Sequence, residues 1–227
     1  MTLYINVLNK KNYSIKYIHR LMKVLKIKSR IRRKHSNYIK TKPEQVGENI
    51  LKRDFKARWK NQKWLTDVTE FKIIGQRRKL YLSSILDLYD RSIVAYVISN
   101  SNNNKLVFDT FDLAIQKYPK AKPIFHSDRG YQYTSKLFKM KLDEQGMIQS
   151  MSRVGRCIDN GPMEGFWGTL KSEMFYGIKW DNESKLREAI IKYIDFYNNK
   201  RLQANLKGMT PVEFGNHANP YLLPLII

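Results

Sequence analysis

The stretch "DNGPMEGFWGTLKSE" contains three acidic residues that could take part in catalysis, Asp159, Glu164 and Glu173. Pro162 suits the first turn of a helix, and "DNG" offers a cap directly before it. At about 100° per residue, this helix is predicted to bury one stripe, formed by Met163, Phe166, Trp167, Leu170 and Met174. The helical phase therefore decides which acid can face a site.

Glu164 lies in the first turn of this predicted helix, at the edge of the buried stripe. Lys171 falls on the same flank two turns later, whereas Glu173 falls on the opposite flank. Glu164 and Glu173 therefore cannot serve one site. We expect Glu164 to do chemistry and Lys171 to hold a phosphate beside it. Asp159 is expected to cap or anchor the loop, and Glu173 to be solvated.

Asp67 is the second candidate acid, in the middle of the predicted strand "KWLTDVTEFKII". Side chains alternate along a strand, so Asp67 shares a largely apolar face with Leu65 and Phe71. A carboxylate on such a face is costly to bury unless a cation or hydrogen-bond donors meet it. The opposite face carries Glu70, which becomes the candidate if the sheet has the other orientation. We favour Asp67 because solvation is poorest in mid-strand.

Asp128 is the third candidate, directly after the predicted buried strand "PIFHS" and before "RGYQY". Ligands collect at strand ends in α/β sheets, and Gly130 lets the chain turn away from such a site. The alternative is a turn aspartate that only caps the loop.

Asp67, Asp128 and Glu164 would form a site with oxygen ligands only. The single cysteine, Cys157, excludes an internal disulfide, and four scattered histidines cannot complete a zinc module with it. Three carboxylates favour Mg²⁺ or Mn²⁺. Two such ions about 4 Å apart can activate a nucleophilic oxygen and stabilise the leaving oxygen of an in-line phosphoryl displacement. The acids therefore predict metal-dependent phosphoryl transfer.

The elements that must position these acids alternate between strands and helices. Strands rich in β-branched and aromatic residues are predicted over residues 63–74, 79–90, 92–99, 122–127 and 147–152. Helices are predicted over residues 104–118, 134–146 and 182–202, besides the helix that begins near Pro162. Thr134 is the expected N-cap of the second of these, with Gly146 just past its end. The order predicts an α/β fold with a mixed five-stranded sheet flanked by helices.

Positive charge is concentrated near the N-terminus. The chain carries 42 Lys and Arg against 20 Asp and Glu, and residues 1–60 alone hold 18 basic and 3 acidic side chains. The segment "SIKYIHRLMKVLKIKS" predicts an amphipathic basic helix capped by Ser14, with Ile15, Ile18, Leu21, Met22 and Leu25 at helical spacing, and a basic run follows it. Such a surplus indicates a segment that binds a polyanion, first of all nucleic acid, rather than a tail that is only solvated. The expected DNA contacts here are Arg20, Lys23, Arg30, Arg32, Arg33 and Lys34.

A membrane role has little support. The N-terminal "MTLYINVLNKK" lacks the apolar region of a secretory signal, and the longest uncharged apolar run, "YLLPLII", is too short to span a bilayer. We therefore expect a cytoplasmic protein that is associated with the nucleoid when DNA-bound.

Four blocks together resemble the OrfB-type transposases of bacterial insertion sequences (the IS-three group), which have an integrase core of the retroviral type. They are "WLTDVTEF", "HSDRGYQYTS", "SRVGRCIDNGPMEGFWGTLKSE" and "YNNKRLQANLKGMTPVEF", and the likeness covers about residues 14–215. The 35 residues between Asp128 and Glu164 match the D-D-35-E pattern of that superfamily. Two positions depart from it: Gln203 stands where many relatives have histidine, and glycine follows "DN" where alanine is common.

The resemblance implies an RNase H-like fold with Asp67 and Asp128 on neighbouring strands and Glu164 on the following helix, as catalytic and metal-binding residues. It implies strand cleavage by water and strand transfer by a 3′-hydroxyl at the inverted repeats of the element. Double-stranded DNA is the expected partner, contacted also by Arg129 and Lys171, with a homo-oligomer on DNA and an OrfA-type partner or fusion. The alternatives are a catalytically silent DNA-binding remnant and a structure-selective nuclease.

The expected organisation has four parts. Residues 1–40 form a partial helix-turn-helix-like segment, residues 41–58 a linker, residues 59–215 the catalytic core and residues 216–227 a tail. The first part is expected to begin part-way through the domain that precedes this core in the family.

Overall fold

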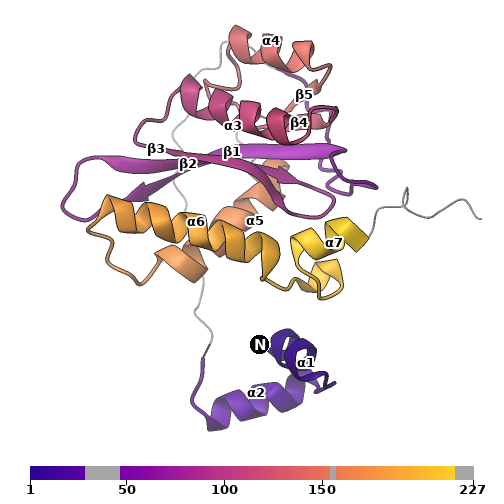
Figure 1. Ribbon diagram of the computed structural model, residues 1–227, viewed down its shortest axis with the longest axis vertical. Helices are drawn as coiled ribbons and strands as arrows, with labels where there is room; N and C mark the ends of the chain where they lie inside the picture. The colour runs from indigo at the N-terminus through magenta and orange to yellow at the C-terminus, as the bar shows by residue number, and fades with distance from the viewer. Residues whose placement is uncertain (29–46, 154–156, 218–227) are drawn as a thin grey trace, which may run out of the picture.

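The computed structural model describes residues 1–28, 47–153 and 157–217. At its centre is one five-stranded sheet with the strand order β3-β2-β1-β4-β5 (Figure 1). The strands are β1 (Lys63–Lys72), β2 (Lys79–Asp87), β3 (Ile93–Ser99), β4 (Ile124–Ser127) and β5 (Ile148–Met151). The first three are antiparallel neighbours, whereas β4 runs parallel to β1 and to β5. The predicted mixed five-stranded sheet is confirmed.

Helices cover both faces of this sheet (Figure 1). One face packs against α3 (Asn104–Lys117) and α4 (Lys136–Glu144), and the other against α5 (Gly161–Leu170) and α6 (Glu183–Asn199). Because apolar side chains leave water on both faces, the chain builds two core layers on one sheet.

Strand β1 takes part in both layers, since its side chains alternate between the faces. Leu65 and Phe71 join the layer under α5 and α6, whereas Trp64 joins the layer under α3 and α4. Asp67 shares the phase of Leu65, so it faces the side that carries α5. Glu70 is exposed on the other phase and pairs with Lys79.

The predicted helix stripes are mostly confirmed. All five apolar residues expected in the stripe of α5 and its extension are buried, and so are Leu186, Ile190, Tyr193, Ile194 and Tyr197 of α6. In α3, Leu106, Val107, Phe111 and Ala114 are buried, whereas Leu113 is 45% exposed. The N-cap of α4 is Ser135, whose hydroxyl accepts from the Phe138 backbone, and not Thr134.

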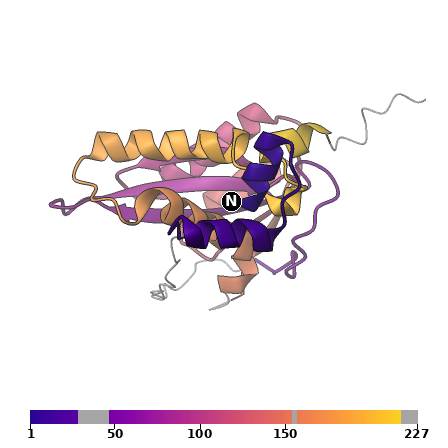
Figure 2. The same cartoon turned by 90° about the horizontal axis from the view of Figure 1, so that it is seen from below.

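Two helices lie at the N-terminus, α1 (Thr2–Asn9) and α2 (Ile15–Val24). The hydroxyl of Ser14 accepts from the Tyr17 backbone and caps α2 as predicted. Of its apolar stripe, however, only Ile18 is buried, and Ile15 is 76% exposed. Helix α1 was not predicted; its Tyr4 hydroxyl accepts from the Leu202 backbone, and it is seen beside α2 in Figure 2.

Short helical segments complete the described chain. They are η1 (Cys157–Asn160), η2 (Lys171–Phe175), η3 (Ala204–Leu206) and α7 (Pro211–His217). Segment η2 is a π-turn that continues α5, and neither it nor α7 was predicted. None of the helices described here has the length and apolar character needed to cross a membrane.

Candidate active site

The strand register brings Asp67 and Asp128 side by side. Leu65 of β1 pairs with His126 of β4, and the two aspartates lie two residues further along these parallel neighbours. Adjacent strands lie about 4.8 Å apart. The predicted juxtaposition of a mid-strand acid with an acid at a strand end is therefore present in the structure.

Asp67 is held by two hydrogen bonds. Its Oδ1 accepts from the Val68 backbone at 2.8 Å, and its Oδ2 accepts from the indole Nε1 of Trp167 at 3.0 Å. Burial, together with the negative charges of Asp128 and Glu164, raises the pKa of Asp67 to about 8, although the two hydrogen bonds oppose the shift. The three predicted acids therefore share one electrostatic environment.

Asp128 leaves β4 at its carboxyl end and turns the chain. Its Oδ1 accepts from the Gly130 backbone at 2.9 Å, and burial raises its pKa. Gly130 is tightly packed, since an added Cβ would lie 3.0 Å from a side-chain oxygen of Gln132 and 3.1 Å from one of Asp128. Asp128 thus caps its own loop and also belongs to the acidic group, so the two interpretations of this residue are compatible.

Glu164 is exposed in the first turn of α5, and two contacts fix this helix to β1. Before Glu164, the side-chain amide of Asn160 donates to the backbone oxygen of Thr66 at 3.1 Å. After it, Trp167 donates to Asp67. Helix α5 is therefore attached to β1 on either side of Glu164. One attachment is at Thr66 and the other is at Asp67 itself.

The donor set suits a hard divalent cation, because it consists of carboxylates from three elements. Within the described parts of the chain, no three histidine, cysteine or acidic side chains are gathered closely enough to surround one ion. The charges interact through Asp67 instead, whose pKa responds to both other acids.

Lys171, expected on the flank of Glu164, lies against the ring of Phe71 in β1. Its Nζ is 5.3 Å from the ring centre of Phe71. Burial lowers the pKa of Lys171, while the charges of Glu70 and Asp67 act in the opposite direction. The π-turn starts at this residue, because the Tyr176 backbone donates to the Lys171 oxygen at 2.7 Å.

Glu173 is exposed, as predicted, but it is also paired with two side chains. Arg201 donates to it through Nε and Nη2, at 2.9 and 2.6 Å, and the Tyr193 hydroxyl donates at 2.7 Å. Burial raises the pKa of Glu173, but these hydrogen bonds outweigh burial and lower it overall. The arginine of the "YNNKR" block therefore fixes η2 to the end of α6, away from the acidic group.

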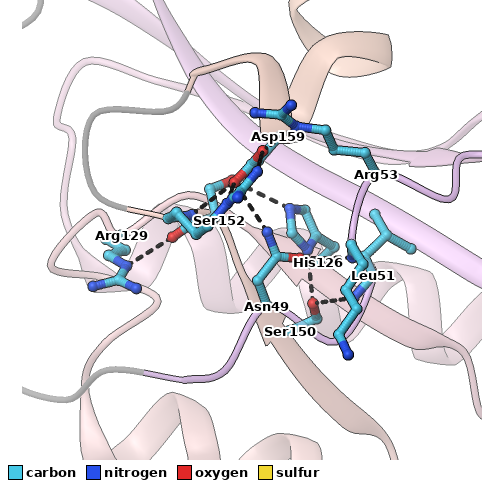
Figure 3. Close-up of polar contacts among 10 residues, drawn as sticks. Asn49, Leu51, Arg53, His126, Arg129, Ser150, Ser152 and Asp159 are labelled. Atoms are coloured by element: carbon cyan, nitrogen blue, oxygen red, sulfur yellow. Dashed lines mark hydrogen bonds and ion pairs between the residues drawn. The ribbon is translucent and has the colours of Figure 1, made fainter.

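Asp159 anchors the loop before α5 more strongly than a cap would (Figure 3). Its side chain is 1% exposed and accepts from Arg53 at 2.6 Å, from Asn49 at 3.0 Å and from three N–H groups of Arg153. These hydrogen bonds, that of the Arg153 side chain above all, hold its pKa well below the usual range. One carboxylate thus joins residues 49–53, the end of β5 and the start of α5.

A second polar group lies next to this anchor (Figure 3). The ring of His126 bonds the hydroxyls of Ser150 and Ser152, at 2.9 and 3.2 Å, and Ser150 also accepts from the Leu51 backbone. Burial lowers the pKa of His126 to about 4, so its ring is neutral at pH 7. This histidine connects β4 with β5 and with the segment that precedes β1.

The predicted DNA contacts are spread over the molecule. Arg129 donates through Nε to the Ser152 backbone oxygen at 2.7 Å, beside the Asp159 anchor (Figure 3). Arg20 and Lys23 are exposed on α2. The remaining four, Arg30, Arg32, Arg33 and Lys34, lie outside the described residues.

Trp167 and Asn160 are the site residues that the sequence analysis did not assign. Trp167 was placed only in the apolar stripe and Asn160 only among possible caps. Both lie within four residues of Glu164. A buried tryptophan needs a hydrogen-bond acceptor for its indole N–H. The prediction that Trp167 is buried close to a group of carboxylates could therefore have indicated its bond to one of them.

Comparison with protein families gives two matches to integrase core domains, over residues 57–157 and 164–218. The chain is 42% identical to the InsK protein of insertion sequence element IS150 of Escherichia coli, over 91% of this chain and 72% of that protein. It is 39% identical to an uncharacterized transposase-like protein of Haemophilus influenzae, over 88% and 91% of the two chains. It is 35% identical to the transposase for insertion sequence element IS904 of Lactococcus lactis, over 81% and 72%.

Solved structures with low sequence identity share the fold. The catalytic core domain of HTLV-2 integrase, in complex with magnesium, superposes with a TM-score of 0.54 at 20% identity, covering 69% of this chain and 97% of that one. A chain of the simian T-cell lymphotropic virus intasome, in complex with a PP2A regulatory subunit, gives a TM-score of 0.61 at 15% identity, covering 99% and 77%. The RNase H-like integrase fold is confirmed.

Proposed function

Because the chain belongs to the family of insertion-sequence transposases with an integrase core domain, we propose that Asp67, Asp128 and Glu164 catalyse metal-dependent DNA strand cleavage and 3′-hydroxyl strand transfer. The observation that supports these residues most directly is their arrangement around β1. Asp67 and Asp128 lie level on paired strands, and the helix that carries Glu164 is bonded to β1 at Thr66 and Asp67.

Mg²⁺ or Mn²⁺ ions, when bound, activate the attacking oxygen and stabilise the leaving oxygen of a phosphoryl displacement. Asp67, Asp128 and Glu164 would hold these ions, and the pKa of Asp67 responds to the negative charges of both other acids. The role of the protein is then to orient these carboxylates. Trp167 holds Asp67 from the helix side, and Asn160 fixes the start of α5.

The proposed substrates are the terminal inverted repeats of an insertion sequence and its target DNA. Lys171, which lies against β1 near Asp67, would hold a phosphate beside the acids. Arg129, Arg20 and Lys23 are further proposed DNA contacts. Two element ends must be brought together before joining, so we propose a homo-oligomer on DNA, with an OrfA-type protein as a separate partner or as a fusion.

The test of this function is a set of charge-removing substitutions at the acids. Asp67→Asn, Asp128→Asn and Glu164→Gln should each lower strand cleavage and strand transfer by about three orders of magnitude or more, because the metal ions supply several kcal/mol of transition-state stabilisation. DNA binding should be retained. Glu70→Gln is the matched control, since Glu70 lies on the same strand but is exposed and paired with Lys79.

Normal cleavage by Glu164→Gln would contradict the assignment. A strand-transfer assay with pre-cut ends also separates the rival functions: joining indicates a transposase, cutting alone a nuclease, and binding alone a silent remnant.

A further inference from the structure

A basic cavity lies at the end of the sheet where β1 and β4 begin. Its volume is about 580 Å³, and it is lined by residues 59–62 and 117–122, which we call the Trp59 pocket. Asp128, in contrast, follows the carboxyl end of β4. The pocket is therefore separated from the acidic group by the length of the parallel strands.

Four lysines line this pocket: Lys60, Lys117, Lys120 and Lys122. Two of them are anchored: the Nζ of Lys60 lies 3.1 Å from the buried carboxylate of Asp90, and the Nζ of Lys117 donates to the Val94 backbone oxygen at 3.2 Å. Lys117, Lys120 and Lys122 are exposed. Burial and the charge of Lys60 both lower the pKa of Lys117, as expected where ammonium groups crowd together. The pocket can therefore neutralise more than one phosphate of a bound polyanion.

Two aromatic side chains lie among these lysines. The Nζ atoms of Lys60 and Lys117 are 5.7 and 5.6 Å from the ring centre of Tyr118. Trp59 is 44% exposed, although tryptophan is usually well covered in a folded protein. Lysines and exposed aromatic rings in one groove are the two elements with which proteins hold an unpaired nucleic-acid strand.

We propose that the Trp59 pocket binds a single-stranded segment of DNA, with Lys120 and Lys122 on its phosphates and Trp59 stacked on an unpaired base. Double-stranded DNA would satisfy the lysines but not the indole, because the faces of paired bases are stacked on each other. The identity of the polyanion as DNA rests on the proposed function. The position of the pocket, at the far end of β1 and β4, separates this segment from the phosphate that the acids act on.

The experiment uses full-length Glu164→Gln protein as background, so that DNA is bound without being cut. Binding of an oligothymidylate is followed by tryptophan fluorescence and repeated over a salt series. Lys120→Gln/Lys122→Gln should weaken binding about five- to tenfold and lower the salt slope by about 1.4, as expected for two single-strand phosphate contacts. Lys105→Gln/Lys192→Gln is the control with the same charge change, since both lysines are exposed and lie on α3 and α6.

Trp59→Phe should remove most of the fluorescence quenching, because Trp64 and Trp167 are buried and the half-buried Trp180 packs against the core layer under α5 and α6, away from the pocket. Equal effects of the two double substitutions would overturn the proposal, and so would unchanged quenching in Trp59→Phe. Duplex DNA that quenches as strongly as the single strand would refute stacking on an unpaired base. Inorganic phosphate that displaces the oligonucleotide at low millimolar concentration would show a simple anion site instead. DNA joining by Glu164→Gln itself would refute the proposed catalytic function and leave these binding results standing.

Discussion

The three acids differ in how far the protein covers them. Glu164 is exposed, whereas Asp67 is half-buried beside α5 and carries a raised pKa. Trp167 stabilises the charged form of Asp67, since a hydrogen bond to a carboxylate lowers its pKa. At the scale of single residues, this indole tunes the most buried acid.

Removing that hydrogen bond should make Asp67 harder to ionise. In Trp167→Phe we expect the pH at which cleavage reaches half its maximum to rise, with a loss of stability of about 1 to 2 kcal/mol. Trp64→Phe is the control, because Trp64 is equally buried but its indole donates to Asn61 at 3.1 Å. The pH profile of cleavage checks this, and an equal shift in both variants would contradict a specific role for Trp167.

His126 should make the protein sensitive to mild acid. Its pKa is about 4 when folded and about 6.5 when unfolded, so the unfolded chain binds the extra proton between these values. The stabilisation is therefore complete above about pH 6.5 and is lost as the pH falls towards 4, by about 2 to 3 kcal/mol in total. Urea unfolding of the wild type and of His126→Asn at a series of pH values should show this loss as the difference between the two, because the raised pKa values of Asp67 and Asp87 change the stability of both in the opposite direction.

Asp159 contributes to the stability of the fold in a different pH range from His126. Its pKa is depressed, so its stabilisation is present above the unfolded pKa near 4 and is lost only at lower pH. A His126→Asn protein that loses stability between pH 6.5 and 4 as steeply as the wild type would show that another group titrates there.

At the scale of elements, periodic patterns made the core helices and strands predictable, and contacts across the chain decided the rest. The stripe of α5 and the alternation of β1 needed only helical and strand geometry. The π-turn could not be read in this way, because Phe175 ends it against Phe71, with ring centres 5.1 Å apart. The pairing of Glu173 with Arg201 could not be predicted from periodicity either, because it depends on where α6 ends.

Gly165 gives a prediction at this scale, since it lies inside α5 next to Glu164. An added Cβ would meet no atom within 4 Å, so Gly165→Ala should stabilise the protein by about 0.5 to 1 kcal/mol. We expect cleavage to fall nevertheless, because the open space beside Glu164 is where a DNA backbone would approach. Thermal unfolding and cleavage assays check the two effects, and a stabilised variant with full activity would show that DNA does not approach there.

At the scale of the whole molecule, the sheet carries acids at one end and a basic aromatic pocket at the other. The acids could be found from sequence because each lies at a recognisable point of one strand, turn or helix. The Asp159 anchor and the Trp59 pocket could not, because they join segments that are distant in sequence: Arg53 with Asp159, and Trp59 with Tyr118. Such pairings become visible only when the fold is known.

The attachment of α5 to β1 also has a consequence for protein synthesis. Asp67 emerges from the ribosome about 100 residues before Glu164 and Trp167, and its face of the sheet is covered only once α5 and α6 have been made. Domains fold as the required segments emerge. If the three acids catalyse strand cleavage as proposed, a nascent or prematurely ended chain would carry the basic N-terminal helices without the complete set of acids, and could not yet break the DNA of its own cell.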